Sequence, residues 1–224
     1  MEMSLNSAQA VKSNIWVPKV AKDSEVSVLT DIYNDETNIV VWQREINKVL
    51  ENYASGWMSD HATHALQSIM TVDNAMNNLS RELPEQEHKI KFREEVFLLI
   101  DMFTCLFDTD TVGLRITPLS AAMCPRFHID KIACRLVVTY GGPGTEWLPE
   151  SNLDRRSLGI GAKGHADHES GVFREQQCIQ KLATQEVALL KGSAWEGNEH
   201  YALTHRSPHL DPGQTRLLLT LDIF

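Results

Sequence analysis

The stretch VGLRITPLSAAMCPRFHIDKIACRLVVTY (residues 112–140) holds two apolar runs on either side of a histidine and an aspartate that are one residue apart. The flanking runs are rich in Val, Ile, Leu, Thr and Tyr, which is typical of β-strands. Similar runs follow in QEVALLKG (185–192), YALTHR (201–206) and TRLLLTLDIF (215–224), with Gly- and Pro-rich turns between them. This pattern predicts a β-barrel in the second half of the chain.

The first half has a different pattern. Residues 1–37 form a polar leader with β-like pieces such as 24–33. Apolar residues then recur at helical spacing in 38–55, 61–80 and 85–107, which predicts three amphipathic helices. Pro84 separates the second predicted helix from the third. The chain therefore predicts a helical first half that supports a β-barrel second half.

The sequence has two further polar features, a long polar segment and a pair of histidines. The segment 149–171 is too long for a plain hairpin loop and is either an active-site lid or a disordered insert. His61 and His64 share one face of the second predicted helix. Because no third ligand is near them in the sequence, we expect a solvated surface pair rather than a metal site.

Composition excludes several classes of partner. The chain has 224 residues and a net charge of −9, with no basic stripe, which argues against nucleic acid and anionic membranes. The longest apolar run, residues 96–103, is broken by Asp101 and is too short to span a bilayer. The first 20 residues lack the apolar core of a signal peptide, so we expect a cytoplasmic protein. The four cysteines form no CxxC pair and are expected to be reduced thiols.

The histidine and aspartate of the opening stretch predict half of a metal site. His128 and Asp130 are two residues apart in an extended segment, so their side chains point to the same side. Two histidines and one carboxylate make the facial triad of non-haem Fe(II) sites, which leaves positions open for substrate, cosubstrate or dioxygen. His205 is the best third ligand, because it lies on a later predicted strand. Arg216 opens the last strand, where a buried cation needs an anionic partner such as a dicarboxylate.

Other residues near these positions have two interpretations each. Cys124 lies four residues before His128, and a thiolate ligand there would favour Zn(II) over Fe(II). Arg126 is either a surface turn residue or a group that faces an acid or the substrate. Arg216 either anchors an anion or forms an ion pair with an acid such as Asp222. Trp147 either caps a substrate pocket or packs on the helical half, which we favour. His165 and His168 are expected to be exposed lid residues rather than ligands.

The ordered set His128, Asp130, His205 and Arg216 resembles the double-stranded β-helix oxygenases that use Fe(II) and 2-oxoglutarate. The resemblance covers roughly residues 112–224. It implies a jelly-roll or cupin-like barrel in residues 111–224, on which a mainly helical part (residues 1–110) packs as one compact α+β unit. It also implies that Arg216 holds the far carboxylate of 2-oxoglutarate, together with Tyr140 on the strand after the HxD motif. Leu218 departs from the common pattern, which has Ser or Thr two residues after the arginine.

The motifs CPRFHID, TYGGPGTEWL, ALLKGSAW and HRSP also resemble a bacterial family of uncharacterised proteins, domain-of-unknown-function family 1826. That resemblance runs through most of residues 90–224 and implies a shared fold and site but no substrate. The favoured interpretation is therefore a 2-oxoglutarate-dependent dioxygenase with an unknown substrate. The alternative is a non-catalytic, cupin-like zinc-binding or metal-homeostasis protein.

Overall fold

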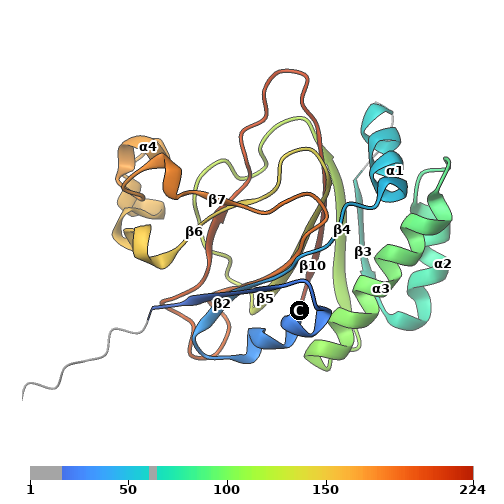
Figure 1. The fold of residues 1–224 in the computed structure, drawn as a ribbon, viewed down its shortest axis with the longest axis horizontal. Helices are drawn as coiled ribbons and strands as arrows, with labels where there is room; N and C mark the ends of the chain where they lie inside the picture. The colour runs from blue at the N-terminus through green and yellow to red at the C-terminus, as the bar shows by residue number, and fades with distance from the viewer. Residues whose placement is uncertain (1–16, 61–64, 224) are drawn as a thin grey trace, which may run out of the picture.

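The computed structural model describes residues 17–60 and 65–223, and within them the chain forms two β-sheets and four α-helices (Figure 1). The larger sheet has seven strands in the order β1-β2-β8-β5-β10-β4-β3, and the smaller sheet has the order β7-β6-β9. The strands of the larger sheet are β1 (Lys19–Asp23), β2 (Thr37–Trp42), β3 (Leu66–Met70), β4 (Val112–Leu119), β5 (Cys134–Gly141), β8 (Val187–Lys191) and β10 (Arg216–Asp222). Those of the smaller sheet are β6 (Glu146–Leu148), β7 (Gln180–Lys181) and β9 (Thr204–Arg206).

The prediction of a single helix over residues 38–55 is wrong at its beginning. Thr37–Trp42 is strand β2, which pairs with β1 in parallel and with β8 antiparallel, and the helix α1 starts later (Lys48–Ser59). Ile39, Val40 and Val41 are all buried because both faces of this strand are covered. A strand buried on both faces has a continuous apolar run instead of alternation, and such a run is easily taken for a helix.

The second predicted helix is shorter than expected for a related reason. Leu66–Met70 is the edge strand β3, and the helix α2 occupies Val72–Glu82. Thr71 starts α2 with a capping box, in which its side chain and that of Asn74 each accept a backbone N–H. His61 and His64 lie outside the described residues.

The third predicted helix is confirmed as α3 (Lys89–Phe107), and Pro84 does separate it from α2. The β-like piece expected within residues 24–33 is instead a 3-10 helix, η1 (Val26–Tyr33), which buries Val28, Leu29 and Ile32. None of the described helices is long and apolar enough to cross a membrane.

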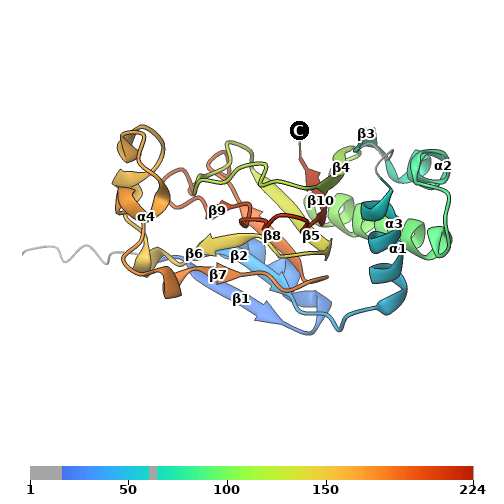
Figure 2. The same ribbon diagram turned by 90° about the horizontal axis from the view of Figure 1, so that it is seen from above.

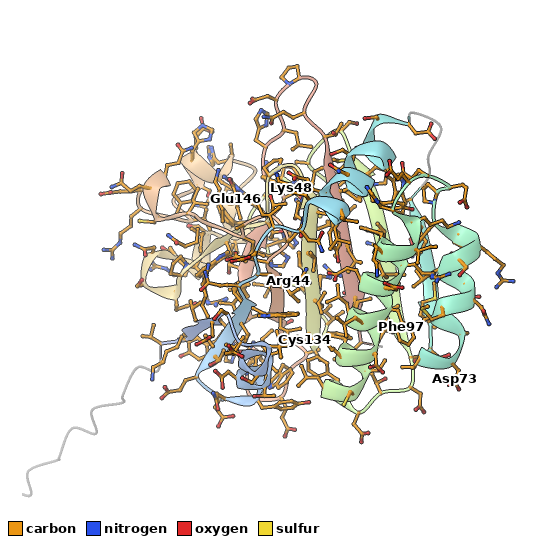
Figure 3. All side chains as sticks on the ribbon, turned by 45° about the vertical axis from the view of Figure 1, so that its right-hand side comes forward. Arg44, Lys48, Asp73, Phe97, Cys134 and Glu146 are labelled. Carbon is orange, nitrogen blue, oxygen red and sulfur yellow. The ribbon has the colours of Figure 1, made fainter. Side chains whose placement is uncertain are left out.

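The larger sheet has two covered faces. On one face, alternate residues of β5 such as Leu136 and Val138 join a core with α1, α2 and α3, which gather on one side of the molecule (Figures 1 and 2). Phe97 of α3 and Cys134 of β5, both labelled in Figure 3, belong to this helix-covered layer. The other face carries a second core, where Val41 and Ala188 of the larger sheet meet Trp147 of the smaller one. The chain is thus a mixed helix and sheet fold in which two sheets face each other.

The long segment between β6 and β7 is folded, which contradicts the idea of a disordered insert. It contains four 3-10 helices and one short α-helix: η2 (Glu150–Asn152), η3 (Arg155–Ser157), η4 (Gly159–Ala162), α4 (Asp167–Ser170) and η5 (Gln176–Cys178). The segment packs against the smaller sheet through a small hydrophobic core of Phe127, Leu148 and Val172. In Figure 1 this segment lies on the side of the molecule opposite α1–α3.

Candidate metal centre

The structure brings His128, Asp130 and His205 together. One potential ligand atom from each side chain lies within 4.8 Å of the others. The Nε2 atom of His205 is 3.5 Å from Oδ2 of Asp130, and Nε2 of His128 is 3.8 Å from Oδ1 of the same carboxylate. Two imidazole nitrogens and a carboxylate oxygen thus converge on one point, which is the donor set expected from the sequence.

Backbone pairing places these side chains. His128 and His205 form an isolated antiparallel bridge, in which each backbone N–H donates to the other residue's carbonyl at 3.0 Å. Residues directly opposite in such a pair have their side chains on the same face. Asp130 follows two residues later, and its carbonyl accepts hydrogen bonds from the backbone N–H and the hydroxyl of Ser193.

Hydrogen bonds also orient both imidazole rings. Nδ1 of His128 lies 2.9 Å from the carbonyl of Arg126, and Nδ1 of His205 lies 3.3 Å from the carbonyl of Leu203. Because a carbonyl only accepts, each Nδ1 carries the proton and each Nε2 keeps a free lone pair. Burial lowers the pKa of His205 to about 4, despite the opposing charge of Asp130, so this ring is neutral at pH 7. His205 is therefore in the neutral form that binds a metal ion, and Nε2 of both rings lies near the carboxylate of Asp130.

Arg135 holds the carboxylate of the triad. Its Nη1 donates to Oδ2 of Asp130 at 2.7 Å, while its Nε and Nη2 bind both oxygens of Asp222. The pairing of Arg216 with Asp222, one of the two alternatives from the sequence, is therefore wrong. The sequence contained one signal for Arg135, which is its position on the strand that directly follows the HxD motif.

Arg216 is 1% exposed, and no carboxylate is paired with it among the described residues. Its Nη2 donates to the hydroxyls of Thr145 at 2.6 Å and Thr139 at 3.2 Å, whereas Nε and Nη1 have no hydrogen-bond partner in the part of the chain that the structure describes. Burial lowers the pKa of this guanidinium to about 10.

Arg216 and the two histidines line the same small cavity of about 60 Å³. The buried hydroxyls of Thr117 and Thr220, which also line it, likewise lack a partner among the described residues. Buried polar groups are normally hydrogen-bonded. A cavity bordered by several unpaired ones is therefore suited to a polar, anionic molecule.

Tyr140 does not belong to this cavity, so the expectation that it helps to bind 2-oxoglutarate is wrong. Its hydroxyl donates to Oε1 of Glu95 on α3 at 2.8 Å, and its ring packs edge-on against Phe92. Neighbouring residues of a strand point to opposite faces, so Thr139 lies on the cavity side and Tyr140 on the helix side. Counting by twos from Val137 would have identified Thr139 from the sequence.

The remaining candidates lie around the site with other contacts. Cys124 lines the cavity, and its backbone pairs with Ser207, but its thiol is not one of the converging ligand atoms. The exposed Arg126 donates to the carbonyl of Gly164. Trp147 packs in the core between the two sheets, which corrects the expectation that it packs on the helical half.

Two histidines of the insert lie away from the converging atoms. The side chains of His165 and His168 are 60% and 71% exposed, as expected for surface residues of this segment. Neither is part of a group of three or more potential ligands among the described residues.

Solved structures of low sequence identity share this fold. Dioxygenase for auxin oxidation 1 from Arabidopsis thaliana, solved as a 2-oxoglutarate complex, aligns with a TM-score of 0.52 and 12% identity over 93% of this chain and 92% of that chain. Dioxygenase for auxin oxidation from rice aligns with a TM-score of 0.52 and 11% identity over 93% and 83% of the two chains.

The chain has no match among curated proteins. A comparison with family models gives a match that covers most of the chain. A family model described as a protein of unknown function, DUF1826, matches residues 23–222, which include the triad and Arg216. The chain therefore belongs to the DUF1826 family.

Proposed function

We propose that this protein is a non-haem Fe(II), 2-oxoglutarate-dependent oxygenase. One observation carries the proposal: a buried arginine that has no carboxylate partner among the described residues and a His–Asp–His triad border the same cavity. A plain structural core has no need for this combination, since an unpaired buried cation costs free energy.

The triad fits a divalent iron ion. Two imidazoles and one carboxylate on the same side are the donor set of non-haem Fe(II) oxygenases, and they leave coordination positions open. A closed zinc site would need a fourth protein ligand, and the Cys124 thiol does not join the set. Bound iron would supply the redox chemistry by which 2-oxoglutarate is decarboxylated and dioxygen is activated.

Arg216 would bind the far carboxylate of 2-oxoglutarate. Its Nε and Nη1 donors are unpaired, and Thr145 and Thr139 hold its Nη2 in place. A guanidinium whose rotamer is fixed in this way presents a planar fork that matches a carboxylate. The apolar side chains of Val137 and Leu218 line the same cavity and would help to exclude water.

The arrangement of the strands supports the same proposal. In the proposed double-stranded β-helix, β4, β5, β8 and β10 form one sheet, and β6, β7, β9 and the bridge at His128 form the other. The helices before residue 110 then cover the outer face of the larger sheet. The neighbour from Arabidopsis thaliana has a similar fold and was solved with 2-oxoglutarate.

The test is metal content and 2-oxoglutarate affinity of anaerobically purified protein. We expect one Fe(II) per chain in the wild type and in His209→Ala, whose side chain is 86% exposed, but none in His205→Ala. We expect 2-oxoglutarate binding to be lost in Arg216→Gln and kept in Arg156→Gln, where a surface ion pair with Asp154 is changed. Tight zinc binding without any 2-oxoglutarate binding would instead support a non-catalytic zinc protein.

A further inference from the structure

The cavity at the triad is lined by four arginines, Arg115, Arg135, Arg206 and Arg216. They differ in whether a carboxylate pairs with them. Arg135 pairs with Asp130 and Asp222, and Arg206 pairs with Glu146 and Asp167. Neither of the other two guanidinium groups is paired with a carboxylate among the described residues. The proposed function uses Arg216 and leaves Arg115 unexplained.

Arg115 lies on β4 at the end of the cavity away from Arg216. It is directly opposite Thr220 of β10 and Gln67 of β3, whereas Arg216 is opposite Leu119. Arg216 and Thr220 are four residues apart on one strand, which corresponds to about 13 Å. The two guanidinium groups are therefore placed to bind two separate anionic groups.

Arg115 also borders a second, outer groove of about 270 Å³. Gln67 and Ile69 of the edge strand β3 form one side of this groove, and Asp222 lies at its other side. Ile69 is 61% exposed and is one of several exposed apolar residues in the described part of the chain. Arg115 thus stands between the cavity that holds the triad and a groove with both polar and apolar surface.

We infer that the substrate is a small carboxylic acid whose carboxylate binds Arg115, at the boundary between the triad cavity and the groove on β3. This inference rests on the proposed function, because it assigns Arg216 to 2-oxoglutarate. One guanidinium and the unpaired Thr220 hydroxyl match the single negative charge of a carboxylate. The protein as a whole has a net charge of −9, which disfavours the approach of an anion to most of its surface. Guanidinium groups that have no carboxylate partner among the described residues would make this cavity the place where an anion is attracted.

The experiment compares probe pairs that differ only in charge. Phenylacetate and phenylacetamide, and hexanoate and hexanamide, are titrated anaerobically into full-length protein loaded with Fe(II) and 2-oxoglutarate. In the wild type we expect each carboxylate to bind at least about tenfold more tightly than its amide. Arg115→Gln should remove that preference while it leaves the affinity for 2-oxoglutarate within about threefold.

Two further variants make the test specific. Arg156→Gln, an exposed arginine that pairs with Asp154 and lines neither the cavity nor the groove, should bind all probes as the wild type does. Arg115→Lys keeps the positive charge and should retain part of the preference. If Arg115→Gln does not fold, the neutral variant Arg115→Met takes its place and should also lose the preference.

Three results would overturn the inference: equal affinity for carboxylates and amides, no binding of any probe, or a loss of 2-oxoglutarate affinity in Arg115→Gln as large as in Arg216→Gln. The last result would mean that Arg115 belongs to the cosubstrate. Failure of the proposed function is distinct, because the wild type would then bind no 2-oxoglutarate before any probe is added.

Discussion

Arg216 is a buried charge whose proposed role in binding would come at the expense of stability. Its pKa is lowered to about 10 because burial disfavours the cation, despite the opposing charge of Glu146, and its hydrogen-bond partners among the described residues are two threonine hydroxyls. For a base, a lowered pKa in the folded state means that the cost is fully present below pH 10 and is relieved only as the pH rises above that value. At neutral pH the protein without ligand therefore carries the whole cost.

Arg216→Met should separate stability from binding. Removing the cation relieves a cost of about 3 kcal/mol, from which the two lost hydrogen bonds subtract about 1 kcal/mol each. We expect the free energy of unfolding of the ligand-free protein to rise by about 1 kcal/mol, while 2-oxoglutarate binding disappears. Urea denaturation measures the first effect and calorimetry the second.

The surface variant Arg156→Met is the control for the loss of an arginine and should change the stability by less than about 0.5 kcal/mol. If Arg216→Met lowered the stability by more than 1 kcal/mol, the guanidinium would have a structural role instead.

At the scale of the elements, the turn after β8 supports the metal site. Gly192 follows Lys191, and a Cβ atom at this position would lie 2.0 Å from the carbonyl oxygen of Ile132 and 3.0 Å from that of Asp130. The turn also donates the hydrogen bonds of Ser193 to the Asp130 carbonyl. Close contact between these two backbones therefore helps to fix the carboxylate of the triad.

Gly192→Ala should weaken metal binding through this contact. Backbone atoms cannot move aside as a flexible side chain does, so the segment at Asp130 must shift. We expect stability to fall by about 1–3 kcal/mol and Fe(II) affinity to fall at least tenfold. Competition with a chromogenic chelator measures the affinity.

Gly213→Ala is the matched control for this prediction. A Cβ there meets nothing within 4 Å, but the residue has a φ of +85°. It should lose about 1 kcal/mol of stability through backbone strain alone and keep its affinity for the metal. Equal loss of metal affinity in both variants would show that the effect is not local to the turn.

For the whole molecule, the proposed metal ion would be an addition to a fold that is stable without it. The core between the helices and the larger sheet and the core between the two sheets contain no residue of the triad. A chain of this length buries enough apolar surface to fold without a metal. Removal of the ion should therefore lower stability only by the free energy of binding.

A chelator should accordingly lower the melting temperature without unfolding the protein. At a free Fe(II) concentration of 100 times Kd, binding contributes about 2.7 kcal/mol, which corresponds to a shift of roughly 5–10 °C. Thermal unfolding followed by circular dichroism measures the shift, and His205→Ala should show none. If the chelated wild type were unfolded at room temperature, the ion would be structural.

The sequence predicts some helices and strands of this fold better than others. Local apolar patterns predict α3 and the strands β4, β5, β8 and β10. Each of these elements is one continuous segment whose apolar residues either recur at helical spacing or form a β-like run. The sequence pattern predicts β2 as part of a helix, because a strand buried on both faces loses its alternation. It predicts β3 as helical for a different reason, since the five residues of this strand directly precede the cap of α2 and continue an apolar pattern of helical spacing.

The amino-acid sequence by itself determined the candidate ligands His128, Asp130 and His205, because spacing within strands decides on which side neighbouring side chains lie. It also singled out Arg216 as a cation in an apolar strand. Tertiary structure alone decided the charge partners: Asp222 pairs with Arg135, Tyr140 binds Glu95, and Arg216 is held by threonines instead of an acid. These pairings join residues far apart in the chain, so local pattern contains no information about them.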